Sequence, residues 1–174
     1  MIEMTAQTKI TIKDEALRAA AAEGMDTFIQ LFVDRMADAV GGELNAEALA
    51  CLNASQITLW GYVILRNELM DGGCVQLIHN GYGDFFFRNP FARAMRQWGV
   101  SELATFINRA KRLCARYGAE LTRECSDEEF MALFERFPAF DELDDYFVEH
   151  EEEFTEAVAR YVDDHVEEFA VVEA

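Results

Sequence analysis

Apolar residues recur every three or four positions along most of the chain, a spacing that places them on one face of an α-helix. The stretch from Asp26 to Val40 shows this pattern, and the glycines Gly41 and Gly42 end it. The same spacing, together with capping residues and helix breakers, predicts further helices. They span Asn45–Leu52, Ser55–Gly72, Cys74–Asn80, Pro90–Trp98, Ser101 to about Gly118, Ser126–Phe137 and Asp141 to about Val171.

Signals for β-strands are scarce. Polar and apolar residues alternate in Thr8–Ile12, which fits either a short strand or an N-terminal arm. The apolar run Asp84–Phe87 is too short to classify. We therefore expect an all-α fold, a single-domain multi-helix bundle with a long acidic C-terminal helix. Residues 1–13 would form an N-terminal arm, and residues 14–174 would form one helical domain.

The last predicted helix combines a regular apolar stripe with a dense acidic face. At about 100° per residue, the stripe contains Leu143, Phe147, His150, Phe154, Val158, Tyr161, His165 and Phe169. The opposite side contains Asp145, Glu149, Glu152, Glu156, Asp163 and Glu167, with Asp144, Glu153 and Asp164 on the flanks. Acids four residues apart repel each other by about 0.2–0.5 kcal/mol, so packing of the stripe must offset this repulsion.

The net charge of −18 is concentrated at this end of the chain. Residues 126–174 hold 18 acidic and 2 basic residues, whereas residues 1–125 hold 15 acidic and 13 basic ones. This charge argues against direct binding of nucleic acid, which needs a basic footprint. Between Asp141 and Val171 there is one carboxylate per about 3.6 Å of helix, and one strand of B-DNA carries a phosphate per about 3.4 Å. The face fits either a phosphate-like surface or an ordinary solvated helix face.

Few residues indicate catalysis, metal binding or cofactor binding. His150 and His165 lie on the apolar stripe without the spacing of a metal site, and we expect them to be partly buried and satisfied. The sequence has no Gly-rich phosphate loop and no nucleophile elbow. We therefore expect a protein that is not an enzyme and that has no cofactor and no metal.

Localisation is predicted from features that the sequence lacks. No apolar run reaches the roughly 18 residues that span a bilayer, and the N-terminus does not resemble a signal peptide. The four cysteines include no C-x-x-C pair and are expected to be free thiols in a reducing compartment. These features predict a cytoplasmic protein without membrane contact.

A second distinctive pattern follows Leu69. It is formed by Gly72, Gly73, Gln76, Asn80 and Gly83. The paired glycines suit a tight turn between helices. Gln76 and Asn80 are four residues apart, so their amides share a helix face and could satisfy backbone groups of the neighbouring turns. A structural role for these amides is favoured over ligand binding.

These motifs resemble those of a family of bacterial DNA-mimic proteins whose C-terminal domain was long a domain of unknown function. A further match to the family is formed by Phe140, Leu143, Asp144 and Tyr146 or Phe147. The resemblance covers about residues 45–165. The sequence departs from the family pattern at Asp71, where Asn is usual, and at Cys74, where an aromatic residue is usual.

The resemblance implies an acidic, all-helical protein without catalytic activity. It further implies a homodimer that occupies the DNA-binding face of a helix-turn-helix repressor. The matched motifs look like residues that determine the fold, not residues that bind a partner. Support for DNA mimicry that does not depend on the resemblance therefore comes from the acidic face.

The main hypothesis follows from the charge distribution and the resemblance together. The chain would compete with DNA for a basic transcription factor or nucleoid protein. The side chains expected to stand in for phosphates are Asp144, Asp145, Glu149, Glu152, Glu153, Glu156, Asp163, Asp164 and Glu167.

Two alternatives remain open. The first is a helical interaction module or immunity-type module that binds through apolar surface, with the acids serving solubility. Exposure would then be expected at Phe85, Phe86, Phe87 or Trp98. The second is an enzyme built around residues 72–83, with a deep pocket. Its lining would include Gln76, His79 and Asn80.

Overall fold

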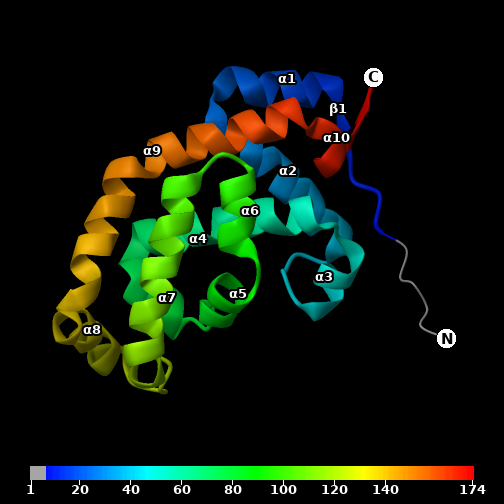
Figure 1. The fold of residues 1–174 in the computed structure, drawn as a ribbon. Helices are drawn as coiled ribbons and strands as arrows, with labels where there is room; N and C mark the ends of the chain where they lie inside the picture. The colour runs from blue at the N-terminus through cyan, green and yellow to red at the C-terminus, as the bar shows by residue number, and fades with distance from the viewer. Residues whose placement is uncertain (1–6) are drawn as a thin grey trace. The chain divides into compact units, whose positions relative to one another are not determined.

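The computed structural model describes residues 7–174, and helices dominate it (Figure 1). This confirms the all-α fold. The described helices are α1 (Asp14–Glu23), α2 (Met25–Val40), α3 (Ala46–Cys51), α4 (Ala54–His79), α5 (Gly83–Arg88), α6 (Phe91–Gln97), α7 (Ser101–Leu121), α8 (Asp127–Arg136), α9 (Asp141–Asp164) and α10 (Val166–Phe169), with a 3-10 turn, η1, at Pro138–Phe140. The two strands are β1 (Thr11–Lys13) and β2 (Val171–Glu173). None of the helices in this range has the length and apolar character needed to cross a membrane.

The chain forms two compact units. Unit 1 takes the segment that ends at Val63 together with Thr155–Ala174, and unit 2 takes Ile64–Phe154. The helices α4 and α9 each begin in one unit and end in the other.

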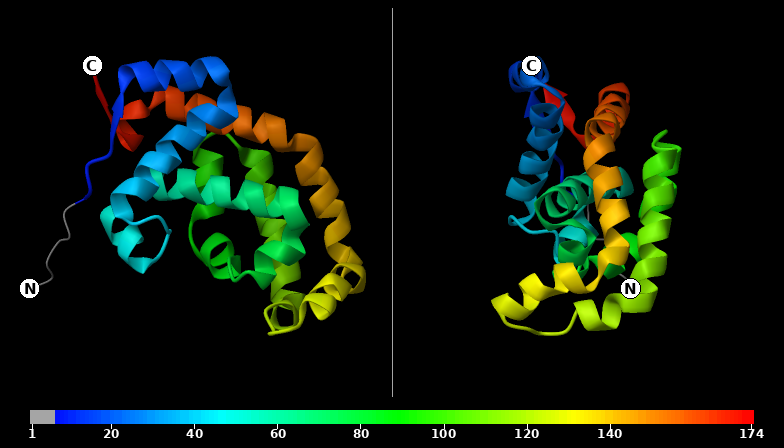
Figure 2. Two further views of the ribbon diagram at one scale, coloured as in Figure 1. Left: turned by 180° about the vertical axis from the view of Figure 1, so that it is seen from behind. Right: turned by 90° about the vertical axis from the view of Figure 1, so that its left-hand side faces the viewer.

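Unit 1 packs α1 against α2 and places β1 beside β2 (Figure 2). Its core includes Phe32 and Phe169, both fully buried, whose rings cross edge to face with centroids 6.1 Å apart. The buried amide of Gln56 donates to the carbonyl oxygen of Phe169 over 2.9 Å. The last residues of the chain are therefore fixed to α2 and to the start of α4.

The C-terminus differs from the single helix predicted to reach about Val171. Helix α9 ends at Asp164, His165 interrupts it with a φ of −134°, and after the short α10 the chain becomes strand β2. Strand β2 runs parallel to β1 with Val171 opposite Thr11, and the N–H of Val171 donates to the carbonyl oxygen of Ile10 over 2.8 Å. The partner strand lies at the other end of the sequence, so the local pattern could not reveal it.

Unit 2 contains α5–α8, the second part of α4 and the first part of α9. Its core is rich in aromatic rings. The rings of Phe86 and Phe91 cross edge to face at 5.0 Å, and those of Phe106 and Phe147 lie 5.6 Å apart. The short run Asp84–Phe87, which its length left unclassified, belongs to α5 because Phe86 and Phe87 can both be buried from a helix.

Several helix ends follow from local capping, as predicted. Asn45 caps α3 by accepting a hydrogen bond from the N–H of Ala48 over 2.9 Å. Ser126 and Glu129 form the predicted capping box of α8, with both hydrogen bonds present at 3.2 Å. At the C-terminal end of α2, Gly41 adopts the left-handed conformation that ends a helix.

Other helix bounds differ from the prediction. Helix α4 begins at Ala54 rather than at Ser55, because the side chains of Asn53 and Gln56 accept hydrogen bonds from each other's backbone N–H groups. Helix α7 runs past Gly118 to Leu121, and α1 was not individually predicted. A single glycine does not end a helix when the apolar face on both sides of it is buried.

Gly73 divides α4 into two helical pieces, as the paired glycines predicted. Its φ of 70° and ψ of −165° belong to a region that is almost restricted to glycine. The carboxylate of Asp144 on α9 lies against this bend and accepts a hydrogen bond from the N–H of Cys74 over 2.8 Å. A Cβ atom on Gly73 would lie 2.4 Å from Oδ2 of Asp144, so the position needs glycine for both conformation and space.

We expect Gly73→Ala to lower the free energy of unfolding by about 2–4 kcal/mol, since it combines backbone strain with a collision. Gly81→Ala is the matched control, because Gly81 also has a positive φ (87°) but a Cβ atom there would meet nothing within 4 Å. Urea denaturation of the two variants checks this expectation. Equal losses would show that the contact with Asp144 adds nothing.

Candidate partner-binding surface

Helix α9 turns most of its acidic residues outward. In unit 2, the side chains of Asp145, Glu149, Glu152 and Glu153 are exposed, while Phe147 on the other side of the helix is fully buried. Residues three or four positions apart are neighbours on a helix surface, so these four carboxylates lie close together on successive turns. The periodicity of the sequence predicted this division correctly.

The part of this segment in unit 1 has the same two-sided character. Glu156, Asp163 and Asp164 are exposed on α9, Glu167 is exposed on α10, and Val158 is fully buried. Eight of the nine predicted site residues are thus exposed. We call these eight the acidic row: Asp145, Glu149, Glu152, Glu153, Glu156, Asp163, Asp164 and Glu167.

Asp144 is the predicted site residue that differs from the other eight. It is half-buried, and its Oδ1 accepts the backbone hydrogen bond from Cys74. Burial raises the pKa of its carboxyl group, an effect that the hydrogen bonds from Cys74 partly oppose. Burial is the main cause that raises the pKa of the Cys74 thiol, and the nearby Asp144 carboxylate raises it further, so the thiol stays protonated. Asp144 holds the bend in α4.

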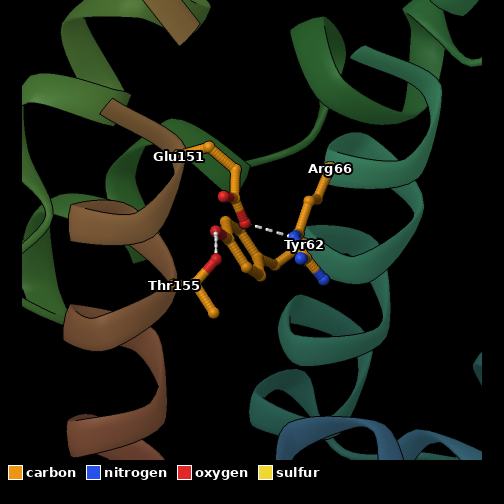
Figure 3. A network of polar contacts seen from close by, with 4 residues as sticks. All are labelled: Tyr62, Arg66, Glu151 and Thr155. Carbon is orange, nitrogen blue, oxygen red and sulfur yellow. Dashed lines mark hydrogen bonds and ion pairs between the residues drawn. The ribbon is translucent and has the colours of Figure 1, made fainter. Parts of the chain in front are cut away.

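Glu151 lies within the acidic run but points inward. Its side chain is 10% exposed and forms an ion pair with the guanidinium Nε of Arg66 on α4, whose side chain is 23% exposed (Figure 3). Glu151 was not among the site residues predicted from the sequence. The signal was present, because Glu151 lies four positions after Phe147 and three before Phe154, on the buried side of the helix.

A second polar contact joins α4 and α9 within unit 1. The hydroxyl groups of Tyr62 and Thr155 lie 2.7 Å apart, and both side chains are fully buried (Figure 3). A buried hydroxyl without a hydrogen-bond partner costs about 1–3 kcal/mol, so each of these groups satisfies the other. Thr155 thus lies on the buried side of α9, and Glu156, the next residue, is exposed.

Glu168 also has a structural role. Its carboxylate accepts hydrogen bonds from the hydroxyl of Ser55 at 2.7 Å and from that of Tyr161 at 3.1 Å. Burial is the main cause that raises the pKa of the Tyr161 phenol, and the hydrogen bond to Glu168 raises it further. The phenol therefore keeps its proton and remains a hydrogen-bond donor. With Asp144 and Glu151, Glu168 belongs to a set of acids that stabilise the fold, separate from the acidic row.

The two histidines of the acidic stretch are partly buried and satisfied, as predicted, and their partners are tyrosines one turn earlier. Nδ1 of His150 lies 2.8 Å from the carbonyl oxygen of Tyr146, and Nδ1 of His165 lies 2.8 Å from that of Tyr161. Each imidazole also stacks on the ring of the same tyrosine, with centroids 4.1 Å apart. Within the described residues, no group of three or more His, Cys, Asp or Glu side chains could hold a metal ion.

The Gly-Gly motif uses its amides differently from the prediction. Gln76 and Asn80 do not bond to neighbouring backbone groups but donate to the carboxylate of Glu68, over 3.0 and 2.9 Å. Gln76 also donates to Asp71 over 2.9 Å, and its side chain covers Gly72. The next residue in this segment, His79, has its Nδ1 2.7 Å from the carbonyl oxygen of Leu121. These polar groups are occupied within the fold.

The aromatic residues that would form an apolar binding surface are largely inside. Phe86 is 1% exposed, Phe87 7% and Trp98 9%, and Phe85 is half-buried. The large apolar side chains that are exposed include Met25, Met70, Met131 and Val148. They occur on different elements, and single exposed apolar residues are ordinary on protein surfaces.

Two comparisons with known proteins bear on this surface. Residues 50–165 match the family described as DMP19-like protein. A relative from Neisseria meningitidis serogroup B (strain ATCC BAA-335 / MC58), named DNA mimic protein DMP19, is 27% identical over 164 residues, which cover 94% of this chain and 96% of the relative. The matched family region closely follows the range of the resemblance found from the motifs.

We expect Asp144→Asn to remove one component of the pH dependence of stability. Because burial raises the pKa of folded Asp144 above its usual 3.8, the folded state keeps this proton to a higher pH than the unfolded state does. The free energy of unfolding therefore falls as pH rises from 3.8 through the raised pKa. Asparagine still accepts the hydrogen bond from Cys74 but cannot ionise. Denaturation of both proteins across this pH range tests the idea, and parallel curves would contradict it.

Glu151 and its neighbour Glu152 offer a direct test of the inward and outward roles. We expect Glu151→Ala to lower the free energy of unfolding by about 2–3 kcal/mol, since it takes the carboxylate away from Arg66. Glu152→Ala should change it by less than about 0.5 kcal/mol. Thermal or urea denaturation of the two variants gives the comparison. Similar effects at both positions would refute the distinction.

Proposed function

We propose that this chain, which belongs to the DMP19-like protein family, acts as a DNA mimic that occupies the DNA-binding surface of a basic protein. The observation that carries the proposal is the acidic row, eight exposed carboxylates on α9 and α10. The name of the Neisseria relative, DNA mimic protein, supports the same function. The target would be a basic transcription factor, such as a helix-turn-helix repressor, or a nucleoid protein.

The acidic row has the physical properties that such a role requires. Within unit 2, Asp145, Glu149, Glu152 and Glu153 provide four carboxylates over nine positions of the helix, which extend about 12 Å. One strand of B-DNA carries three to four phosphates in about the same length. Lysine and arginine side chains that contact phosphates could therefore reach carboxylates here.

The scaffold keeps these charges in place. The inward acids have partners in the fold, so the surface carboxylates are not needed to hold α9 on its neighbours. Carboxylates on a helix that is already folded lose less conformational freedom when a partner binds than those of a disordered segment would. The protein would act by occupying the partner, not by catalysis.

The setting of this encounter is part of the proposal. We place it in the cytoplasm, where transcription factors meet DNA. A homodimer would present two acidic rows related by a twofold axis. Helix-turn-helix repressors are themselves twofold dimers that bind two half-sites, so such an arrangement would match their symmetry.

We expect a basic DNA-binding protein to be recovered with the tagged chain from its host at about 50 mM salt and lost at about 200 mM salt. Changing Asp145, Glu149, Glu152 and Glu156 to Asn or Gln should abolish recovery at low salt. With the purified partner, the slope of log Kd against log salt should fall by up to about four. DNA should compete with the chain for this partner.

The matched control removes the same charge elsewhere. Glu15, Glu23, Glu43 and Glu47 are also exposed, and none lies on α9 or α10. Changing these four to Gln should leave most of the binding intact. Equal losses of binding in both quadruple variants would show that only the total negative charge matters and that the acidic row has no special role. Partners that stay bound at high salt would favour binding through apolar surface.

A further inference from the structure

Unit 1 contains a hollow of about 320 Å³ beside its part of the acidic row. One side of the hollow is apolar and is formed by Ala21 at the end of α1 and by Met25 and Phe28 at the start of α2. The other side belongs to α9 and carries the carboxylates of Glu156 and Asp163. Apolar surface and negative charge thus meet in one depression.

Small residues are the reason for the space. Ala21 lines the hollow, as does Gly24 between α1 and α2, and a Cβ atom on Gly24 would meet nothing within 4 Å. Met25 remains 38% exposed at the same place, so its apolar side chain is accessible in the hollow. The hollow therefore offers apolar contact that the fold itself leaves unused.

The hollow already contacts one cation. Arg160, the single basic residue of the acidic stretch, lines it and forms an ion pair with Glu156 over 2.6 Å. Both side chains are more than half exposed, at 68% and 56%. An exposed pair of this kind, four residues apart on a helix, contributes little to stability, so an incoming cation can displace Arg160 at little cost.

We propose that this hollow receives a lysine or arginine side chain of the basic partner. The inference rests on the proposed function and adds the place where the partner inserts a side chain. The aliphatic stem would lie on Met25 and Ala21, and the charged group would replace Arg160 between Glu156 and Asp163. Lysine and arginine combine an apolar stem with a charged end in this way, and a phosphate row offers no such apolar contact.

Filling the hollow without changing the charge tests the proposal, with the synthetic peptide nona-arginine as the probe. We expect Ala21→Trp to raise the Kd of the peptide at least about fivefold. Ala22→Trp is the matched control, because Ala22 is the next residue of α1, is also exposed and does not line the hollow. Isothermal titration calorimetry at low salt measures both variants.

Removing the internal cation should have the opposite effect. We expect Arg160→Gln to tighten peptide binding more than Arg18→Gln does. Arg18 forms a comparable ion pair with Asp14, at 2.7 Å and four residues apart, but it lies outside the hollow. Both changes remove one positive charge, so the difference between them reports the hollow alone.

The methyl signal of Met25 in NMR spectra locates the bound peptide. It should shift and saturate on titration, while that of Met131, exposed on α8 in unit 2, should shift little. If peptide binding depends on salt but the Kd does not differ between Ala21→Trp and Ala22→Trp, the hollow is not the binding place of the side chain. The acidic row would then remain the proposed partner site. Recovery of no DNA-binding protein from the host would instead overturn the proposed function, whatever the peptide does.

Discussion

Burial of the apolar side of α9 is the condition on which its acidic side depends. Phe147 and Val158 are fully buried, and each such side chain contributes about 1.5–3 kcal/mol when it leaves water. A pair of like charges four residues apart costs only about 0.2–0.5 kcal/mol. Packing therefore exceeds repulsion by a wide margin, and a helix can hold carboxylates on successive turns while it remains attached to the core.

The acids of α9 and α10 have divided roles. Glu151 pairs with Arg66, Asp144 holds the bend of α4 and Glu168 binds hydroxyl groups, so each inward carboxylate has partners within its own unit. The acidic row contributes little to this internal bonding. Under the proposed function, stability and recognition depend on different residues of one segment, although all of them are the same two amino-acid types.

Local features of the sequence predicted much of this structure, and long-range contacts account for the rest. The capping box at Ser126, the bend at Gly73 and the exposure of the acidic row follow from residues a few positions apart. The pairing of β2 with β1 and the ion pair of Glu151 with Arg66 need partners far away in sequence. The hollow is of the second kind, since Ala21 of α1 and residues of α9 line it together from distant parts of the sequence.

The division of roles has a consequence for how such proteins change over time. An exposed Glu of the acidic row can become Asp, or move by one helical turn, without loss of packing or of negative potential. An inward Glu cannot, because its partner is fixed in position. Selection on the surface would therefore act on amino-acid composition more than on individual positions. Two chains with 27% identity over nearly their whole length can then keep a similar negative surface although their individual acidic residues differ in position.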